Sequence, residues 1–235
     1  MSSLTRIRNA IVLPHADLPR PPRNGHVVVA GPDPDQILLL GGGPAVGWGT
    51  VIHDLGVPGF LARWLTAATG RGAEVTVVAD PSISVQRARR SLDSVDLALF
   101  DYVVLTLGVE DAVDGIRPSA WRSALTEVLV RLRAECPEAT PILVAGIQPV
   151  RSIPIYDHPR TRPADKRALT LNKLSAAVCA EIPGVTFVPM AGVAAASEAG
   201  HTKKNYSRWA WLLVKAMSAD LATAAPRSTI GSAAD

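Results

Sequence analysis

The sequence predicts an α/β fold, with helices covering both faces of a five-stranded parallel sheet in a three-layer α/β/α arrangement. Short apolar runs alternate along the chain with longer segments of helical periodicity, which is the pattern of consecutive βαβ units. Crossovers between parallel strands are right-handed, so these units wind around both faces of one sheet. The first apolar run ends at Leu40 and passes at once into three glycines, as a buried strand does when it enters a tight turn.

The 235 residues are expected to fall into three parts. Residues 1–35 contain many Pro, Gly and Arg residues and are expected to form an extended lead-in. Residues 36–222 carry the alternating pattern and are long enough to bury a sizeable core without disulfides or metals. Residues 223–235 are small and polar and are expected to be a disordered tail.

Short apolar runs place the expected strands, and helical periodicity places the expected helices. The strands are expected at 36–41, 73–79, 101–107, 141–147 and 185–189. The helices are expected at 58–69, 83–92, 118–135, 163–181 and 203–222. The third of these helices has the clearest signals, because Pro118 suits a first helical turn and Leu125, Leu129 and Leu132 recur at helical spacing.

Composition argues against several classes of function. The net charge is +3 and no basic run is interleaved with aromatic residues, so nucleic-acid binding is not expected. No stretch approaches about 18 consecutive apolar residues, and the N-terminus lacks a secretory signal, so we expect a cytoplasmic protein without a membrane span. Cys136 and Cys179 lack a partner motif and are expected to be free thiols. No metal site or cofactor is indicated, and the oligomeric state is left open.

Ligands of open α/β sheets bind outside the carboxyl ends of the strands. We therefore expect the site where the predicted strands end. These strand ends are Gly41–Gly43, Asp80–Ser82, Gly108–Glu110, Gln148–Pro149 and the segment after Pro189.

From about residue 36 to 217, the order and spacing of these blocks resemble the SGNH (GDSL-type) hydrolase superfamily. Gly41-Gly42-Gly43 stands where that family has a Gly-Asp-Ser turn, and Pro44-Ala-Val-Gly-Trp-Gly49 follows as in many bacterial members. Leu105–Asp111 resembles the strand followed by Gly-x-Asn-Asp, and Tyr206–Ala210 resembles the helix after the family's Asp-x-x-His. The resemblance implies a flavodoxin-like strand order and an ester or acyl substrate, or another small-molecule ligand.

The resemblance also implies roles that these residues carry poorly. The nucleophilic serine matches Gly43, which has no hydroxyl to activate. The oxyanion-binding asparagine matches Glu110, whose ionised carboxylate would repel an oxyanion. The glycine of the second block falls around Asp80-Pro81-Ser82. The Asp-x-x-His becomes Glu198-Ala-Gly-His201, although strict counting back from Tyr206 places Gly200 at the histidine.

Two functions follow from this pattern. In the first, the protein is a degenerate family member that is not a conventional serine esterase and retains a ligand-binding cleft. In the second, it is an ester hydrolase in which a water molecule is activated by Glu110, Asp111, Glu198 and His201. The residues expected to line the cleft are Gly42, Gly43, Trp48, Ser82 and Asp111. We expect Gly43, Glu110 and His201 to converge at the carboxyl edge of the sheet.

Structural roles remain open for several of these residues. Glu110 and Asp111 could be a solvated pair at a helix start, where carboxylates interact favourably with the helix dipole. His201 could be a surface histidine, and Trp48 could pack beneath the turn. His53 and Asp54 are expected to form a loop pair that caps the next helix. The segment Tyr156-Asp157-His158 lies in a Pro-rich loop that either covers the site or only fills the loop.

A dinucleotide-binding turn is the rival interpretation of the glycines. Gly41, Gly43 and Gly47 follow a first strand as in short-chain dehydrogenases, and Asp80 ends the second strand. Asp80, however, lies 37 residues after Gly43, whereas that fingerprint places its acidic residue about 20 residues on. The chain also lacks a Tyr-x-x-x-Lys sequence. We therefore prefer the hydrolase-like interpretation.

Overall fold

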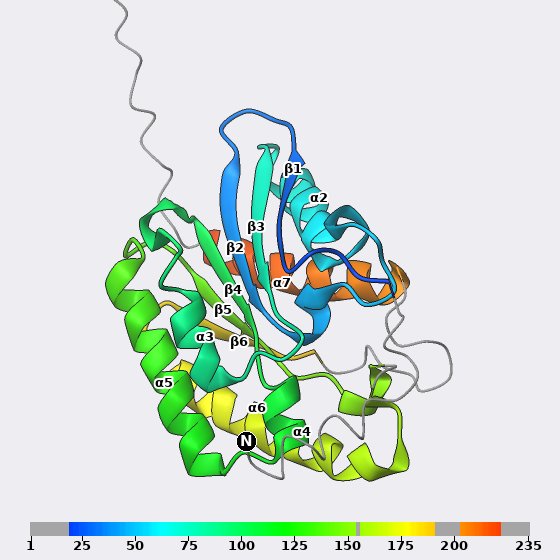
Figure 1. The fold of residues 1–235 in the computed structure, drawn as a ribbon. Helices are drawn as coiled ribbons and strands as arrows, with labels where there is room; N and C mark the ends of the chain where they lie inside the picture. Colours follow the sequence, from blue (N-terminus) through cyan, green and yellow to red (C-terminus); the bar gives the residue numbers. More distant parts are fainter. Residues whose placement is uncertain (1–18, 154–155, 191–202, 222–235) are drawn as a thin grey trace, which may run out of the picture.

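The computed structural model describes residues 19–153, 156–190 and 203–221, which contain one six-stranded sheet (Figure 1). The strands are β1 (Asn24–Val29), β2 (Asp35–Gly41), β3 (Ala73–Ala79), β4 (Tyr102–Thr106), β5 (Ile142–Ala145) and β6 (Val185–Val188). Their order across the sheet is β1-β3-β2-β4-β5-β6. The strands β2 to β6 are parallel, in the flavodoxin-like order that the sequence predicts.

The expected strand count was wrong by one, because the lead-in also contributes a strand. β1 pairs antiparallel with β3 at the edge of the sheet, where Val27 lies opposite Val75. Val27 is the only side chain of β1 that is buried, so the strand lacks the continuous run of buried residues that β2, β4 and β5 have. An edge strand can satisfy its backbone with few apolar contacts, and this explains why hydrophobic periodicity did not reveal it.

The helices form a layer on each face of the sheet (Figure 1). One layer contains α2 (Val57–Thr69) and α7 (Lys203–Leu221), which pack against each other. The other contains α3 (Val85–Ser91), α5 (Pro118–Glu135) and α6 (Arg162–Ala180), together with the short α4 (Val109–Asp114). The predicted three-layer α/β/α architecture is therefore confirmed.

Each face of the sheet has its own hydrophobic core. Along β2, Leu38 and Leu40 face the core shared with α3, α5 and α6, whereas Ile37 and Leu39 face the core shared with α2 and α7. This alternation follows from the period of two along a strand. Because both faces are covered, β2 has a continuous apolar run from Ile37 to Leu40, which is why the sequence predicts it so clearly.

Trp209, on α7, is fully buried in the core between this helix and the sheet. Its ring meets the Tyr206 ring edge to face, with the ring centroids 5.6 Å apart. Trp211, two residues further along the helix, is exposed, as expected for residues that cannot share a helix face.

The two cysteines, Cys136 and Cys179, are buried free thiols, as expected. Burial raises the pKa of the Cys179 thiol to about 12, so the thiol stays protonated near neutral pH. A protonated, buried thiol is a poor nucleophile, and this gives Cys179 a packing role.

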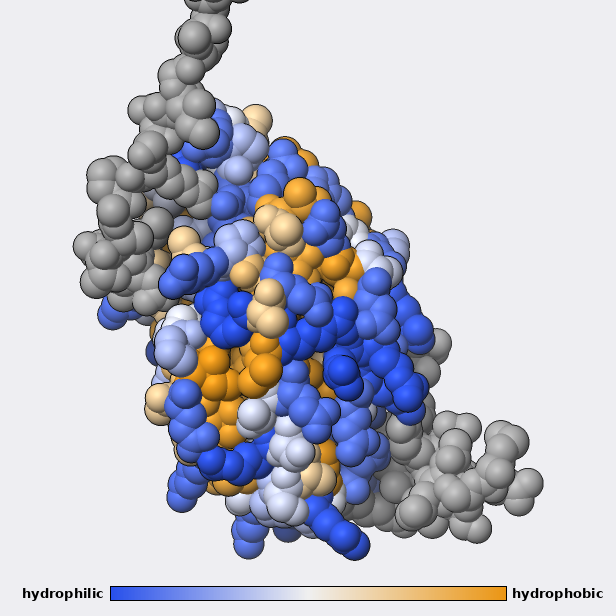
Figure 2. All heavy atoms as spheres, turned by 90° about the vertical axis from the view of Figure 1, so that its left-hand side faces the viewer, coloured by the Kyte–Doolittle hydropathy of each residue, from blue (hydrophilic) through white to orange (hydrophobic). Residues whose placement is uncertain are grey.

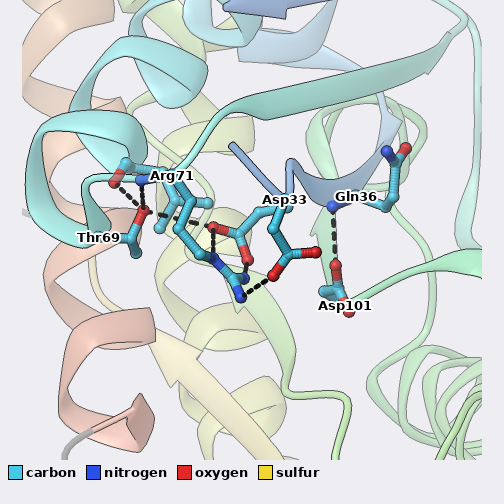
Figure 3. Close-up of polar contacts among 7 residues, drawn as sticks. Asp33, Gln36, Thr69, Arg71 and Asp101 are labelled. Carbon is cyan, nitrogen blue, oxygen red and sulfur yellow. Dashed lines mark hydrogen bonds and ion pairs between the residues drawn. The ribbon is translucent and has the colours of Figure 1, made fainter. Parts of the chain in front are cut away.

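A buried ion pair fixes the amino-terminal edge of the sheet, at the opposite end of β2 from the glycine turn (Figure 3). Asp35, at the start of β2, is fully buried, and its carboxylate pairs with the Arg71 guanidinium. Arg71 Nη1 also donates to Asp33 Oδ2 at 3.0 Å, and Thr69 Oγ1 donates to Asp35 Oδ2 at 3.4 Å. These contacts tie the end of α2 to the beginning of β2.

The surface over α5 carries apolar side chains among charged ones (Figure 2). Val130 on α5 is exposed, and so is Leu99 in the short helical turn Leu97–Leu99, which contacts α5. An open cavity of about 540 Å³ lies between α3 and α5, and its lining includes Arg89, Arg90 and Arg131. In the part of the chain that the structure describes, no helix is long and apolar enough to cross a membrane.

Candidate functional site

The glycine turn after β2 is held against the end of β4. Gly42 N–H donates to the Thr106 carbonyl at 2.7 Å, and Thr106 Oγ1 donates back to the Gly42 carbonyl at 3.0 Å. Gly41 has a φ of +147°, and a Cβ there would lie 2.2 Å from the Thr106 carbonyl oxygen. The turn approaches β4 so closely that only glycine fits at position 41.

Gly43, the residue that matches the family's nucleophile, has a φ of +50°. This left-handed conformation disfavours residues that carry a Cβ. A Cβ built on Gly43 would lie 3.2 Å from both Gln148 Nε2 and Val109 Cγ2. The backbone and its neighbours at this position are therefore suited to glycine and not to a serine side chain.

The β4–α4 connection places Glu110 beside this turn, because Val109, the residue before it, contacts the space over Gly43. Glu110 lies in the first turn of α4 and is only 7% exposed. Its Oε1 accepts a hydrogen bond from the Tyr156 hydroxyl. The carboxylate that the sequence resemblance aligns with the family's asparagine thus accepts from a donor in the loop after β5.

Asp111 is engaged with a neighbouring helix. Its carboxylate oxygens accept from the Val85 N–H at 3.0 and 3.3 Å, so Asp111 satisfies a free donor at the start of α3. Burial raises the pKa of Asp111 to about 6, although the Val85 hydrogen bond opposes the shift and the charge of Asp114 adds to it. The alternative of a solvated pair at a helix start was wrong, because Glu110 and Asp111 are both buried. Asp111 instead caps the start of α3 across space.

Ser82 follows β3 in a small hydrogen-bonded turn. Its backbone N–H and its hydroxyl both donate to Asp80 Oδ1 at 2.9 Å. Burial pushes the pKa of Asp80 upward, but the Ser82 hydrogen bonds and the nearby charges of Arg23 and Arg87 outweigh it and lower the pKa overall. Gly42 lies close by, since a Cβ there would be 3.4 Å from the Asp80 carbonyl oxygen.

Trp48 packs into the protein beneath the turn and is 7% exposed. Its carbonyl accepts a hydrogen bond from the Tyr206 hydroxyl at 2.7 Å, which joins the turn to α7. The Arg20 guanidinium lies 5.5 Å from the centroid of the indole ring. Packing accounts for most of the Trp48 surface.

Residues 19–23 form a strap along the glycine turn and the end of β3. The Pro19 carbonyl accepts from the Gly49 N–H at 2.8 Å, and the Arg23 carbonyl accepts from the Ala79 N–H at 2.7 Å. His53 Nε2 donates to the Pro22 carbonyl at 3.0 Å, and desolvation lowers the pKa of this histidine. The expectation that His53 and Asp54 cap the next helix was therefore wrong: His53 is bonded to the strap, and the N-cap of α2 is Gly56, without a side-chain cap.

Gln148 is a site residue for which no role could be predicted from the sequence. It follows β5, is 1% exposed, and its Nε2 has no hydrogen-bond partner. The sequence signal was present, because Gln148 was expected at a strand end. Its orientation toward Gly43 depends on the loop after β5 and could not be inferred from residue spacing.

Glu198 and His201 lie outside the described residues, so their expected convergence with Gly43 remains a prediction. Within the described ranges, Gln148 lies against Gly43, and Glu110 follows Val109, which also borders Gly43. No group of three or more His, Cys, Asp or Glu residues in these ranges could hold a metal ion.

This α/β sandwich, with a glycine turn at the carboxyl edge of its sheet, has the architecture of a hydrolase-type fold. The chain belongs to the GDSL-like lipase/acylhydrolase family, whose model matches residues 32–213. No match to a curated protein sequence was found.

Several solved structures share the fold. An aryl esterase from M. smegmatis is 20% identical with a TM-score of 0.61, over 79% of this chain and 99% of the esterase. A lipase/acylhydrolase from Enterococcus faecalis is 17% identical with a TM-score of 0.62, over 79% of this chain and 96% of the other. A carbohydrate acetylesterase from Sinorhizobium meliloti is 14% identical with a TM-score of 0.61, over 79% and 99%.

Proposed function

We propose that this protein is a non-catalytic member of the GDSL-like family, which binds a small acyl-containing ligand without forming an acyl-enzyme. The observation that carries the proposal is Gly43. The position of the nucleophile has no side chain, its φ is +50°, and Gln148 and Val109 stand 3.2 Å from where a Cβ would be.

The chemical argument begins with the missing hydroxyl. Covalent ester hydrolysis in this fold needs a nucleophile that an adjacent base can activate, and glycine supplies none. The oxyanion then needs hydrogen-bond donors, but Glu110 places an acceptor where the family has an amide. Two separate requirements of the reaction are therefore unmet at neighbouring positions.

Hydrolysis by an activated water is the second function considered, and the contacts of the carboxylates argue against it. Glu110 accepts from the Tyr156 hydroxyl, and Asp111 accepts from the Val85 N–H. A general base must be able to take a proton from a water beside the substrate. Both carboxylates instead make hydrogen bonds within the protein, which favours binding without turnover.

The ligand class follows from the family. The fold neighbours include an aryl esterase and a carbohydrate acetylesterase, which by their names act on esters. We propose that this chain binds the same kind of small molecule, an ester or another acyl compound, at the edge formed by Gly43, Glu110 and Gln148.

A panel of p-nitrophenyl esters with acyl chains of two to twelve carbons tests the proposal. We expect release of p-nitrophenol at the rate of a mock preparation that lacks the protein. Thermal-shift measurements with the corresponding methyl esters should nevertheless show saturable stabilisation, because a ligand that binds only the folded state raises its melting temperature. Turnover well above the mock rate would contradict the proposal.

A further inference from the structure

We propose that the side-chain amide of Gln148 is the group that binds the ligand, by donating a hydrogen bond to a neutral acyl carbonyl oxygen above Gly43. This inference rests on the proposed function and names its ligand-binding donor. It assigns the amide donor to the end of β5, whereas the family pattern places an asparagine at the position of Glu110.

The first argument is the unmatched hydrogen-bonding capacity of this amide. Gln148 is 1% exposed, and its Nε2 has no partner. A buried donor without an acceptor destabilises the folded state, and such groups are rare in folded proteins. A ligand oxygen that accepted this hydrogen bond would recover that free energy.

The second argument is direction. Nε2 lies 3.2 Å, and Oε1 3.7 Å, from the point where a Cβ of residue 43 would be. The amide thus faces the space that a nucleophilic side chain would occupy. Because Gly43 brings no side chain of its own against this amide, the amide and the glycine turn border the same site.

The third argument is that the backbone beside Gln148 is fixed. Asn172 on α6 accepts from the Ile147 N–H at 2.7 Å and donates to the Ile147 carbonyl at 2.9 Å. This pair of hydrogen bonds holds the residue immediately before Gln148. A donor held in place in the free protein loses little entropy when a ligand binds.

Charge decides which carbonyl compounds fit. Two buried carboxyl groups, Glu110 and Asp111, follow Val109, the residue that also contacts the space over Gly43. A carboxylate ligand would meet them with charge of the same sign in a poorly solvated place. An ester or amide carbonyl is neutral and accepts the same hydrogen bond without that repulsion.

The test follows the Gln148 side-chain NH₂ resonances in ¹⁵N–¹H spectra, assigned by their loss in Gln148→Leu. The probes are methyl butyrate, N-methylbutyramide and sodium butyrate. We expect the two neutral probes to shift these resonances and to bind at least about tenfold more weakly to Gln148→Leu, the loss that corresponds to one hydrogen bond. Butyrate should bind more weakly than either neutral probe.

Two variants separate ligand binding from a structural role. Gln148→Leu should be as stable as the wild type or more stable, because it removes an unpaired buried donor. Gln86→Leu changes an exposed glutamine on α3 and should leave binding unchanged. If Gln148→Leu does not fold, Gln148→Glu replaces the donor with an acceptor of the same shape and should show the same loss of neutral-probe binding.

The other outcomes are decisive as well. Neutral probes that bind wild type and Gln148→Leu equally, tighter binding of butyrate, or no binding of any probe would each overturn the role of Gln148. Release of methanol from methyl butyrate would instead overturn the proposed non-catalytic function, and the resonance shifts would still report on Gln148. The two failures are therefore distinguishable.

Discussion

The Tyr156 hydroxyl donates a hydrogen bond to the Glu110 carboxylate, which joins the loop after β5 to the first turn of α4. By its resemblance to the family, the sequence aligns Glu110 with an asparagine that binds the oxyanion. The sequence did not decide whether the loop that contains Tyr156 covers the site or has no functional role, and in the structure this loop contacts Glu110. This contact favours a structural role for Glu110 over a role as a general base.

A double-mutant cycle on this pair should show strong coupling. Tyr156→Phe removes the donor and Glu110→Gln removes the charge of the acceptor, and a hydrogen bond to a charged group contributes about 1.5–3 kcal/mol. We expect a coupling free energy of about 1–3 kcal/mol from urea denaturation of the four proteins.

The control is a second cycle that pairs Tyr156→Phe with Glu127→Gln, a change at an exposed position of α5. The effects of these two changes on the free energy of unfolding should add to within about 0.5 kcal/mol. Additivity in the Tyr156–Glu110 cycle would mean that this hydrogen bond contributes nothing to the native state.

Asp111 should make the protein less stable as the pH rises from about 4 to 7. Its pKa is about 6 in the folded protein, above its usual value of 3.8. The folded state therefore holds the proton more tightly, so this contribution is complete below about pH 4 and is lost as the pH rises through 6. The difference of about two pKa units corresponds to about 3 kcal/mol.

Asp111→Asn cannot ionise, while its amide oxygen can still accept from the Val85 N–H. Relative to the wild type, the variant should gain up to about 3 kcal/mol of unfolding free energy between pH 4 and pH 7, measured by urea denaturation. The same series on Asp54→Asn, at an exposed carboxylate, gives the general effect of losing a negative charge. Parallel pH curves for wild type and Asp111→Asn would refute the assignment.

The Asp35–Arg71 pair at the opposite edge should be important for stability but not for ligand binding. Arg71→Met leaves the fully buried Asp35 carboxylate without its counter-charge, which costs about 3–5 kcal/mol. The double variant Asp35→Leu with Arg71→Met should recover much of this loss, because it removes both buried charges.

Arg122→Met serves as the matched control, since Arg122 pairs with Glu181 on the surface and such pairs contribute about 0–1 kcal/mol. Equal losses for Arg71→Met and Arg122→Met in urea denaturation would contradict the buried role of Asp35.

The parallel strands and the long helices could be predicted because burial determines their sequences. β2 is covered on both faces, so Ile37 to Leu40 form a continuous apolar run. β1 was missed because its pairing depends on backbone hydrogen bonds to β3, with little burial of its own side chains. The helix α4 has only six residues. Glu110 and Asp111 were considered as a helix start, but the bounds of the helix were not predicted.

The candidate site was predictable only where it depends on strand ends. Gly43 and Glu110 were expected at the carboxyl edge, and both are found there. The partners of the side chains were not predictable, because the Tyr156 contact to Glu110 joins residues 46 positions apart and the Val85 contact to Asp111 joins residues 26 apart. Such pairings depend on the packing of loops and short helices, which leave no periodic signal.

Gly43→Ser alone should not produce an esterase. The serine would have to adopt the backbone φ of about +50° that Gly43 has, at a cost of about 1–2 kcal/mol. Its Cβ would also lie too close to Gln148 and Val109. Glu110 would still oppose the oxyanion, and losing one donor typically lowers the rate about 10²–10³-fold. Adding Glu110→Asn should raise activity beyond either single variant in a non-additive way. Hydrolysis of p-nitrophenyl acetate by the four proteins measures this, and vigorous turnover by Gly43→Ser would contradict it.

Intact-protein mass spectrometry after treatment with a fluorophosphonate tests the central claim most directly. The reagent forms a stable adduct only with an activated hydroxyl, and position 43 has none. We predict that the wild-type mass remains unchanged under conditions that fully label an active serine esterase. A stoichiometric adduct, mapped by peptide sequencing to Ser82, Thr50 or any other hydroxyl, would show that the nucleophile has moved and that the protein is an enzyme.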